Sequence, residues 1–230
     1  MHHRFGKVII LSLIYVMKDD INSYINTFFW PILFVIIIWA VKGIEIFFNI
    51  NDLYFLGIQS GKNVYRIFTF PFIHSDFNHL INNTYPMMLL GGIISSVYRT
   101  ISLKVYISSF ILSGFIFWII GERNEIYVIG ASSFIYYLAG FVFFSGFIRK
   151  QPRLAILSFL VIFLNFVNIW GLIEIPDDNI SQMSHLAGFI SGLIIAITLK
   201  NQGPKPKKYQ WEIDEEKEEN EIGIKYIYRK

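Results

Sequence analysis

The sequence of 230 residues contains no cysteine, and charged residues make up only 16% of it. Without cysteine the chain can form neither a disulfide nor a thiolate metal site. It also lacks the His-Glu-x-x-His pattern that binds zinc on a helix. No long apolar run holds the pair of aspartates that an intramembrane aspartyl protease would need. The net charge of +3 is too small to indicate a nucleic-acid partner. We therefore expect no metal, no cofactor and no nucleic acid.

The apolar residues, which are 54% of the chain, gather in long runs. A helix needs about 20 residues to cross about 30 Å of hydrocarbon, with a lower limit near 17. Six runs lie in or near that window, at residues 28–48, 77–97, 103–120, 130–148, 154–170 and 182–199. We therefore predict an all-α, polytopic membrane helix bundle with six transmembrane helices.

The positions of lysine and arginine predict how these spans are oriented. With the N-terminal segment 1–27 in the cytoplasm, the inner segments carry twelve Lys and Arg residues and the outer segments four, leaving out the distal tail. Because positive residues favour the cytoplasmic side, we expect both termini to be cytoplasmic and the membrane to be the cytoplasmic membrane of a bacterium. The six-span domain covers 28–200. The acidic tail at 201–230 is predicted to be mostly disordered.

A few polar side chains interrupt the apolar runs, and such groups are costly in lipid. They are His79, Asn82, Asn83, Ser132, Ser133 and His185. A serine hydroxyl becomes a good nucleophile when a histidine takes its proton, and hydrogen-bond donors can stabilise the resulting oxyanion. His79 and Asn83 are four residues apart, so they share one helix face. Each residue alone has another interpretation: a serine can bond its own helix backbone, and a histidine can bond a neighbouring helix.

Two of the patterns around these residues resemble motifs of the rhomboid family of intramembrane serine proteases. The family's His-x4-His-x3-Asn pattern at the start of the second helix stands here as His74, His79 and Asn83. Its Gly-x-Ser-x motif at the start of the fourth helix stands as Gly130 and Ser132. The residue after the motif serine is usually glycine in the family and is a second serine here.

Further matches lie on the fourth and sixth spans and in the first loop. The family's His-x2-Gly-x3-Gly motif stands at His185, Gly188 and Gly192. A tyrosine that packs on the catalytic histidine in the family is matched by Tyr136. The family's Trp-Arg pair in the first loop is present with Arg66, although a tyrosine precedes it. The resemblance covers about residues 28–200.

The resemblance implies a serine endopeptidase that hydrolyses peptide bonds in or near transmembrane segments. Ser132 would be the nucleophile and His185 the general base of a dyad. His79, Asn83 and the Ser132 backbone N–H would hold the oxyanion, and Tyr136 would stack on the imidazole. Supporting or structural roles would fall to Gly130, His74, Arg66, Gly188 and Gly192.

The partners implied are the lipid bilayer and single-span or other membrane-protein substrates. The alternative is a non-catalytic chaperone or trafficking factor of rhomboid-like fold. Loss of the serine or the histidine would favour that alternative, and both residues are present.

Overall fold

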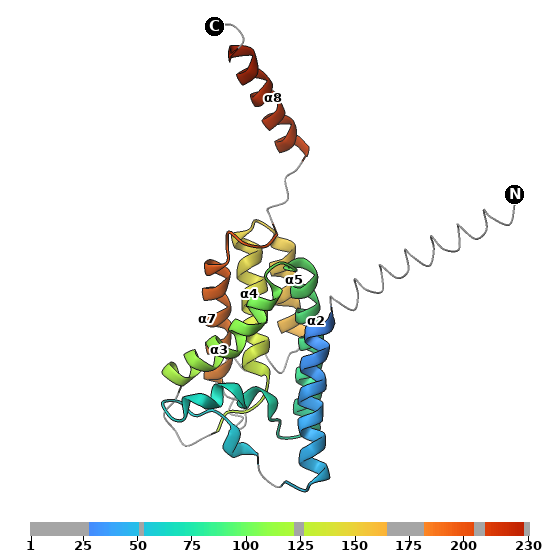
Figure 1. Cartoon of the computed structure of the whole chain (residues 1–230), viewed down its shortest axis with the longest axis vertical. Coiled ribbons are helices and arrows are strands. Elements are labelled where there is room, and N and C mark those ends of the chain that lie inside the picture. The colour runs from blue at the N-terminus through green and yellow to red at the C-terminus, as the bar shows by residue number, and fades with distance from the viewer. Residues whose placement is uncertain (1–27, 51–52, 122–126, 165–181, 205–209, 228–230) are drawn as a thin grey trace, which may run out of the picture.

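The computed structural model describes residues 28–50, 53–121, 127–164, 182–204 and 210–227, so the predicted N-terminal segment 1–27 lies outside the described residues. The described residues form helices and short 3-10 turns, with no strand among them (Figure 1). The helices are Phe28–Phe47, α2 (Phe77–Val97), α3 (Ser102–Ile120), α4 (Ser132–Ile148), α5 (Pro152–Leu164), α7 (Gln182–Thr198) and α8 (Gln210–Ile227). The 3-10 helices η1 (Tyr54–Leu56), η2 (Val64–Phe68) and η3 (Phe70–Phe72) lie in the first loop.

A helix lies at each of the six runs predicted to span the membrane, although only the first part of 154–170 is described. The all-α prediction is therefore confirmed. Phe28–Phe47 and Ser102–Ile120 are long and apolar enough to cross a membrane, whereas Ser132–Ile148 and Gln182–Thr198 are apolar but shorter. The number of six spans stays a prediction.

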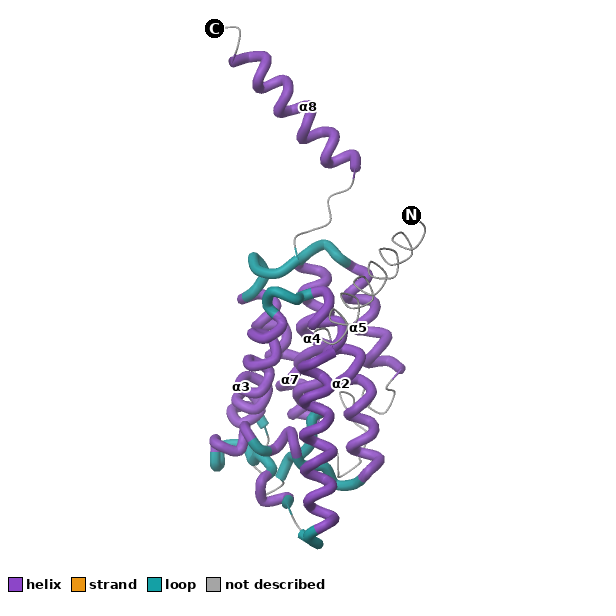
Figure 2. Tube along the Cα trace, turned by 45° about the vertical axis from the view of Figure 1, so that its right-hand side comes forward, coloured by secondary structure: helices purple, strands orange, loops and turns teal. Residues whose placement is uncertain are grey.

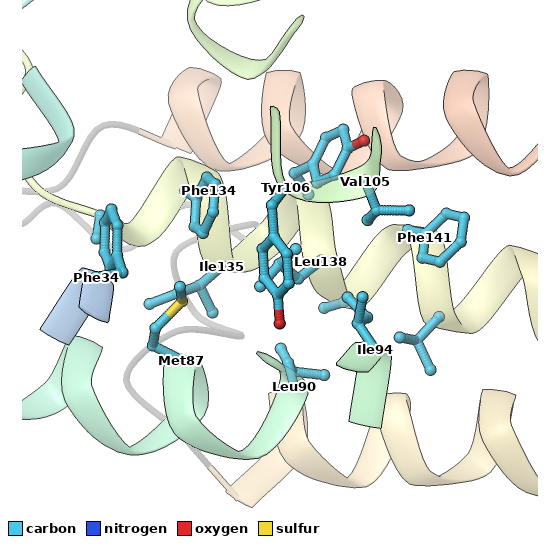
Figure 3. Close-up of a cluster of buried hydrophobic side chains, with 14 of the residues drawn as sticks. Phe34, Met87, Leu90, Ile94, Val105, Tyr106, Phe134, Ile135, Leu138 and Phe141 are labelled. Carbon is cyan, nitrogen blue, oxygen red and sulfur yellow. The ribbon is translucent and has the colours of Figure 1, made fainter. Parts of the chain in front are cut away.

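Helix α4 is the centre of the bundle and contacts α2, α3, α5 and α7 (Figures 1 and 2). Its residues from Ser133 to Val142 are all buried, as expected of a helix that is apolar on every side. Side chains from four helices meet on one face of α4 (Figure 3). They are Phe34, Met87, Leu90, Ile94, Val105, Tyr106, Phe134, Ile135, Leu138 and Phe141.

The outer faces of the helices are apolar as well. Ile36, Ile107, Ile156 and Ile197, from four different helices, are each more than half exposed. Soluble proteins rarely expose apolar patches larger than a few hundred Å². An outer surface of this kind is suited to lipid.

Helices α4 and α7 run in parallel and approach closely because two glycines of α7 face α4. A Cβ added to Gly188 would fall closer than 2.5 Å to the carbonyl oxygen of Ser133 and would lie 3.2 Å from the Tyr136 Cβ. A Cβ on Gly192 would lie 2.6 Å from the backbone nitrogen of Phe141. Any larger residue at either position would push the two helices apart.

Arg149 joins the C-terminal ends of α4 and α7. Its guanidinium donates to the carbonyl oxygens of Leu199 (2.7 Å), Pro204 (3.1 Å) and Gln202, and it lies 5.8 Å from the centre of the Tyr98 ring. The last carbonyl groups of a helix have no partner within it. Arg149, only 4% exposed, supplies donors at the end of α7 and so closes the bundle on this side.

The tail differs from the prediction of disorder, because residues 210–227 form helix α8. Six of its 18 residues are glutamate, which is a good helix former. Asp214 lies 3.9 Å from the Lys217 ammonium and accepts a hydrogen bond from Gln210 at 3.0 Å. Low hydrophobicity argues against burial, but it does not prevent a solvated helix with local side-chain pairs.

Candidate active site

Ser132 is the first residue of α4, at the end of the bundle where α7 also begins. The N-cap residue, Ala131, has no side chain that could bond the free backbone N–H groups of the first turn. Those N–H groups and the helix dipole favour negative charge at this end. Ser132 is partly exposed, whereas Ser133 is only 1% exposed. Ser132 is thus the more accessible of the two hydroxyls.

Tyr136 connects the start of α4 with the start of α7. Its ring stacks on the imidazole of His185, with 4.3 Å between the ring centres and 17° between the planes. Tyr136 lies four residues after Ser132 and therefore on the same face of α4. His185 is only 4% exposed. The structure thus brings the predicted base and its predicted stacking partner together on the face of α4 that carries the predicted nucleophile.

The first loop holds the short segment that precedes Ser132. Ile58 and Val128 form an antiparallel bridge, with both N···O distances at 2.9 Å. The N–H of Gly130 donates to the carbonyl of Phe70 at 2.9 Å. Gly130 has a φ of +99°, a region that favours glycine. These bonds fix the backbone that leads into α4.

His79 and Asn83 face this segment from α2. A Cβ on Gly130 would lie 2.5 Å from His79 Nε2 and 3.6 Å from Asn83 Nδ2, so both side chains approach the backbone two residues before Ser132. Asn83 Nδ2 is buried and has no hydrogen-bond partner among the residues that the structure describes. Buried donors normally find a partner. An unused amide N–H at this place is suited to a ligand oxygen.

His74 packs behind His79, with 5.0 Å between the ring centres in an edge-to-face arrangement. Burial, to which the neighbouring His79 adds, lowers the pKa of His74 from 6.5 to about 3. The Phe72 carbonyl offsets part of this effect, but neither ring nitrogen meets hydrogen-bond geometry. His74 is therefore neutral at pH 7, and its contacts are those of a structural residue.

Arg66 does not lie with the other predicted residues. Its guanidinium is 5.2 Å from the centre of the Tyr127 ring and donates to the Gly57 carbonyl at 3.5 Å. It therefore contacts the start of the segment that leads to Ser132 and not the candidate site itself.

Three polar residues near the site were missed by the sequence analysis. The Lys42 ammonium, at the end of the first helix, donates at 3.1 Å to the carbonyls of His74 and Ser75. Asp76 caps α2 by accepting from the His79 N–H at 2.9 Å, and the Ser75 hydroxyl contacts both Asp76 and His79. An Asp directly before an apolar helix is a usual N-cap signal, and a lysine within a predicted span is unusual enough to have been noticed.

These features define a class of protein: an apolar helix bundle, suited to a membrane, that gathers a hydroxyl, two imidazoles and an amide at one end. The model of the Rhomboid domain matches residues 61–202 of the chain. Since this is more than half of the sequence, the chain belongs to the rhomboid family, a family of integral membrane proteins.

Relatives of the chain are found in mycobacteria. A protein of Mycobacterium leprae (strain TN) is 28% identical over 136 residues, which cover 56% of this chain and 53% of the relative. A protein of Mycobacterium tuberculosis (strain H37Rv) is 27% identical over 136 residues, covering 56% of each chain. Both are named as uncharacterized proteins. The matched region spans about half the length of these relatives.

Proposed function

We propose that the protein is an intramembrane serine protease that hydrolyses peptide bonds in or near transmembrane segments through a Ser132–His185 dyad. The observation that carries this proposal is the stack of Tyr136 on His185 at the start of α4 and α7. It fixes the plane of the imidazole on the helix face that carries Ser132. A protein that only binds helices has no need for an imidazole held against the helix face that carries a serine at the helix N-terminus.

In the first step, the Ser132 hydroxyl oxygen attacks the carbonyl carbon of the substrate while its proton moves to His185. The carbonyl double bond opens, and its electron pair forms an oxyanion. When the tetrahedral intermediate collapses, the C–N bond breaks and the leaving amine takes the proton from His185. Water, activated by the same histidine, then attacks the acyl-enzyme and releases the acid and Ser132. Serine and histidine are regenerated, so no further reactant is required.

Three groups are suited to the oxyanion. The Ser132 backbone N–H lies in the first turn of α4, where N–H groups have no partner within the helix. Asn83 Nδ2 is buried and unpartnered, and His79 Nε2 faces the backbone at Gly130. Losing one such donor costs roughly 10²–10³ in rate in serine proteases.

The orientation follows from the charge distribution along the chain. With both termini in the cytoplasm, the starts of α4 and α7 lie toward the outer side, and water reaches Ser132 from there. Arg149 and the tail lie on the inner side. Single-span membrane proteins are the expected substrates, because their helices reach the site from the bilayer.

The test is cleavage of a generic single-span substrate by purified protein and by two serine variants. Ser132→Ala should abolish cleavage, whereas Ser133→Ala should retain it at least in part, because the Ser133 hydroxyl is buried. If Ser132→Ala cleaves as fast as the unmodified protein, the proposed dyad is wrong. If the unmodified protein cleaves none of several such substrates, a non-catalytic chaperone or trafficking factor becomes the better interpretation.

A further inference from the structure

The Ser75 hydroxyl lies between two groups at the start of α2. Its oxygen is 2.7 Å from the Asp76 carboxylate oxygen Oδ2 and 3.2 Å from His79 Nδ1. The other carboxylate oxygen of Asp76 accepts the His79 backbone N–H at 2.9 Å. The three residues thus form a small hydrogen-bond network beside the candidate oxyanion site.

The positions of the hydrogen atoms in this network follow from counting donors. The pKa of Asp76 lies below its ordinary value, mainly because the carboxylate accepts the His79 backbone N–H and, second, because it accepts the Ser75 hydroxyl. Asp76 is therefore ionised at neutral pH and can only accept hydrogen bonds. Ser75 has one hydroxyl hydrogen, and it points to Asp76. The Ser75 oxygen therefore accepts from His79, which means that His79 carries a hydrogen on Nδ1.

A neutral imidazole has one N–H, so with the hydrogen on Nδ1 the other nitrogen, Nε2, is an acceptor. Nε2 is the atom that faces the backbone at Gly130. It can donate to an oxyanion only after a second proton, taken from solvent, has made His79 an imidazolium.

We propose that Ser75 and Asp76 are positioning residues for the oxyanion site: they hold the His79 hydrogen on Nδ1 and aim Nε2 at the oxyanion, which His79 binds as an imidazolium. This inference rests on the proposed function. The Asp76 carboxylate, relayed through Ser75, stabilises the cation that the reaction needs.

Among the residues that the structure describes, few other charged or titratable groups lie around His79. Burial of the His79 ring opposes the cation most. Lys42, from the first helix, opposes it as well, although its ammonium is bonded to the carbonyls of His74 and Ser75 and to the Glu45 carboxylate. His74 is neutral at pH 7. The described part of the facing segment before α4, residues 127–131, contains no charged residue. Asp76 is therefore the group that favours a charged His79, and its removal should be visible in the pH dependence of the rate.

Nitrogen NMR of the protein labelled with ¹⁵N-histidine in detergent tests the tautomer directly. The His79 signals are identified by their loss in His79→Gln. Neutral His79 should show a protonated Nδ1 and a free Nε2. In Ser75→Ala, which keeps the Asp76 cap of α2, a share of molecules should move the hydrogen to Nε2. Asn78→Ala should leave the His79 signals unchanged, because the exposed Asn78 side chain takes no part in the network and the variant keeps the backbone N–H that faces Asp76.

Kinetics then separate positioning from simple structural support. In Ser75→Ala, kcat should fall about tenfold with KM unchanged, because the variant loses only part of the roughly 10²–10³ in rate that one oxyanion donor contributes. Ser75→Thr, which again supplies a hydroxyl, should restore kcat. In Asp76→Ser, which retains an N-cap side chain, the loss of rate at alkaline pH should begin at lower pH.

Two results would overturn the inference: a hydrogen on Nε2 of neutral His79 in the unmodified protein, or a loss of rate in Ser75→Ala without any change of tautomer. The NMR result does not depend on proteolysis. If Ser132→Ala still cleaves, the proposed dyad fails while the tautomer assignment stands. If the dyad holds and His79 carries its hydrogen on Nε2, only the inference fails.

Discussion

Replacing Gly188 by alanine should slow cleavage far more than it destabilises the fold. The added Cβ would fall closer than 2.5 Å to the Ser133 carbonyl oxygen, whereas ordinary contacts begin at 3.4 Å. Because that oxygen belongs to the backbone of α4, α7 must move outward by about 1 Å. His185 lies one turn before Gly188 and moves with it, away from Ser132 and Tyr136. A displacement of about 1 Å at reacting groups costs on the order of 10²-fold in rate.

The stability change should be small because two effects oppose each other. Overpacking costs about 1–3 kcal/mol, whereas alanine is favoured over glycine in a helix by about 1 kcal/mol. Turnover of one substrate and the melting temperature are measured for Gly188→Ala and for a control, Gly43→Ala. Gly43 has no atom within 4 Å of an added Cβ, so the control should keep the rate of the unmodified protein.

A rate for Gly188→Ala within about threefold of the control would refute the reasoning, because it would mean that the start of α7 can shift without disturbing the dyad. A variant that loses rate and also melts much earlier than the control would show that the helix contact fails as a whole, which the opposing terms above do not predict.

Three further predictions concern the dyad, the oxyanion donors and the tail. His185→Ala should be as inactive as Ser132→Ala, and the double variant no slower than either in single-turnover cleavage, since residues that act as a unit are not additive; a much slower double variant would argue against one dyad. Asn83→Ala and His79→Ala should each keep a detectable rate, reduced by about 10²–10³, and full activity in both would contradict the oxyanion assignment. Deleting residues 205–230 should change turnover of detergent-solubilised protein by less than about tenfold, because the deletion keeps Pro204, the last residue whose carbonyl Arg149 binds. A larger loss would show that α8 supports the active fold.

The sequence was sufficient for the features that depend on periodic or local patterns. Apolar runs predicted where the helices lie, because a helix in lipid must satisfy its backbone bonds internally and present apolar side chains outward. The stack of Tyr136 on His185 was expected from the motifs on the two helices.

Other features depend on contacts between distant segments, which no local pattern shows. The bridge from Ile58 to Val128 joins residues 70 apart, and Lys42 reaches two carbonyls more than 30 residues away. The residue types of Ile58 and Lys42 do not predict which distant residues they contact. The network of Ser75, Asp76 and His79 is local, but its meaning depends on which nitrogen faces Gly130, and only the fold determines that.

The central claim is that Ser132 is the nucleophile that His185 activates. A serine-directed fluorophosphonate offers the most direct test, because it forms a covalent bond with an activated serine and the modified residue can be found by mass spectrometry of the digested protein. The account predicts one adduct, on Ser132, which disappears in His185→Ala and persists in Ser133→Ala. An adduct on Ser133, or labelling of Ser132 at the same rate without His185, would contradict it.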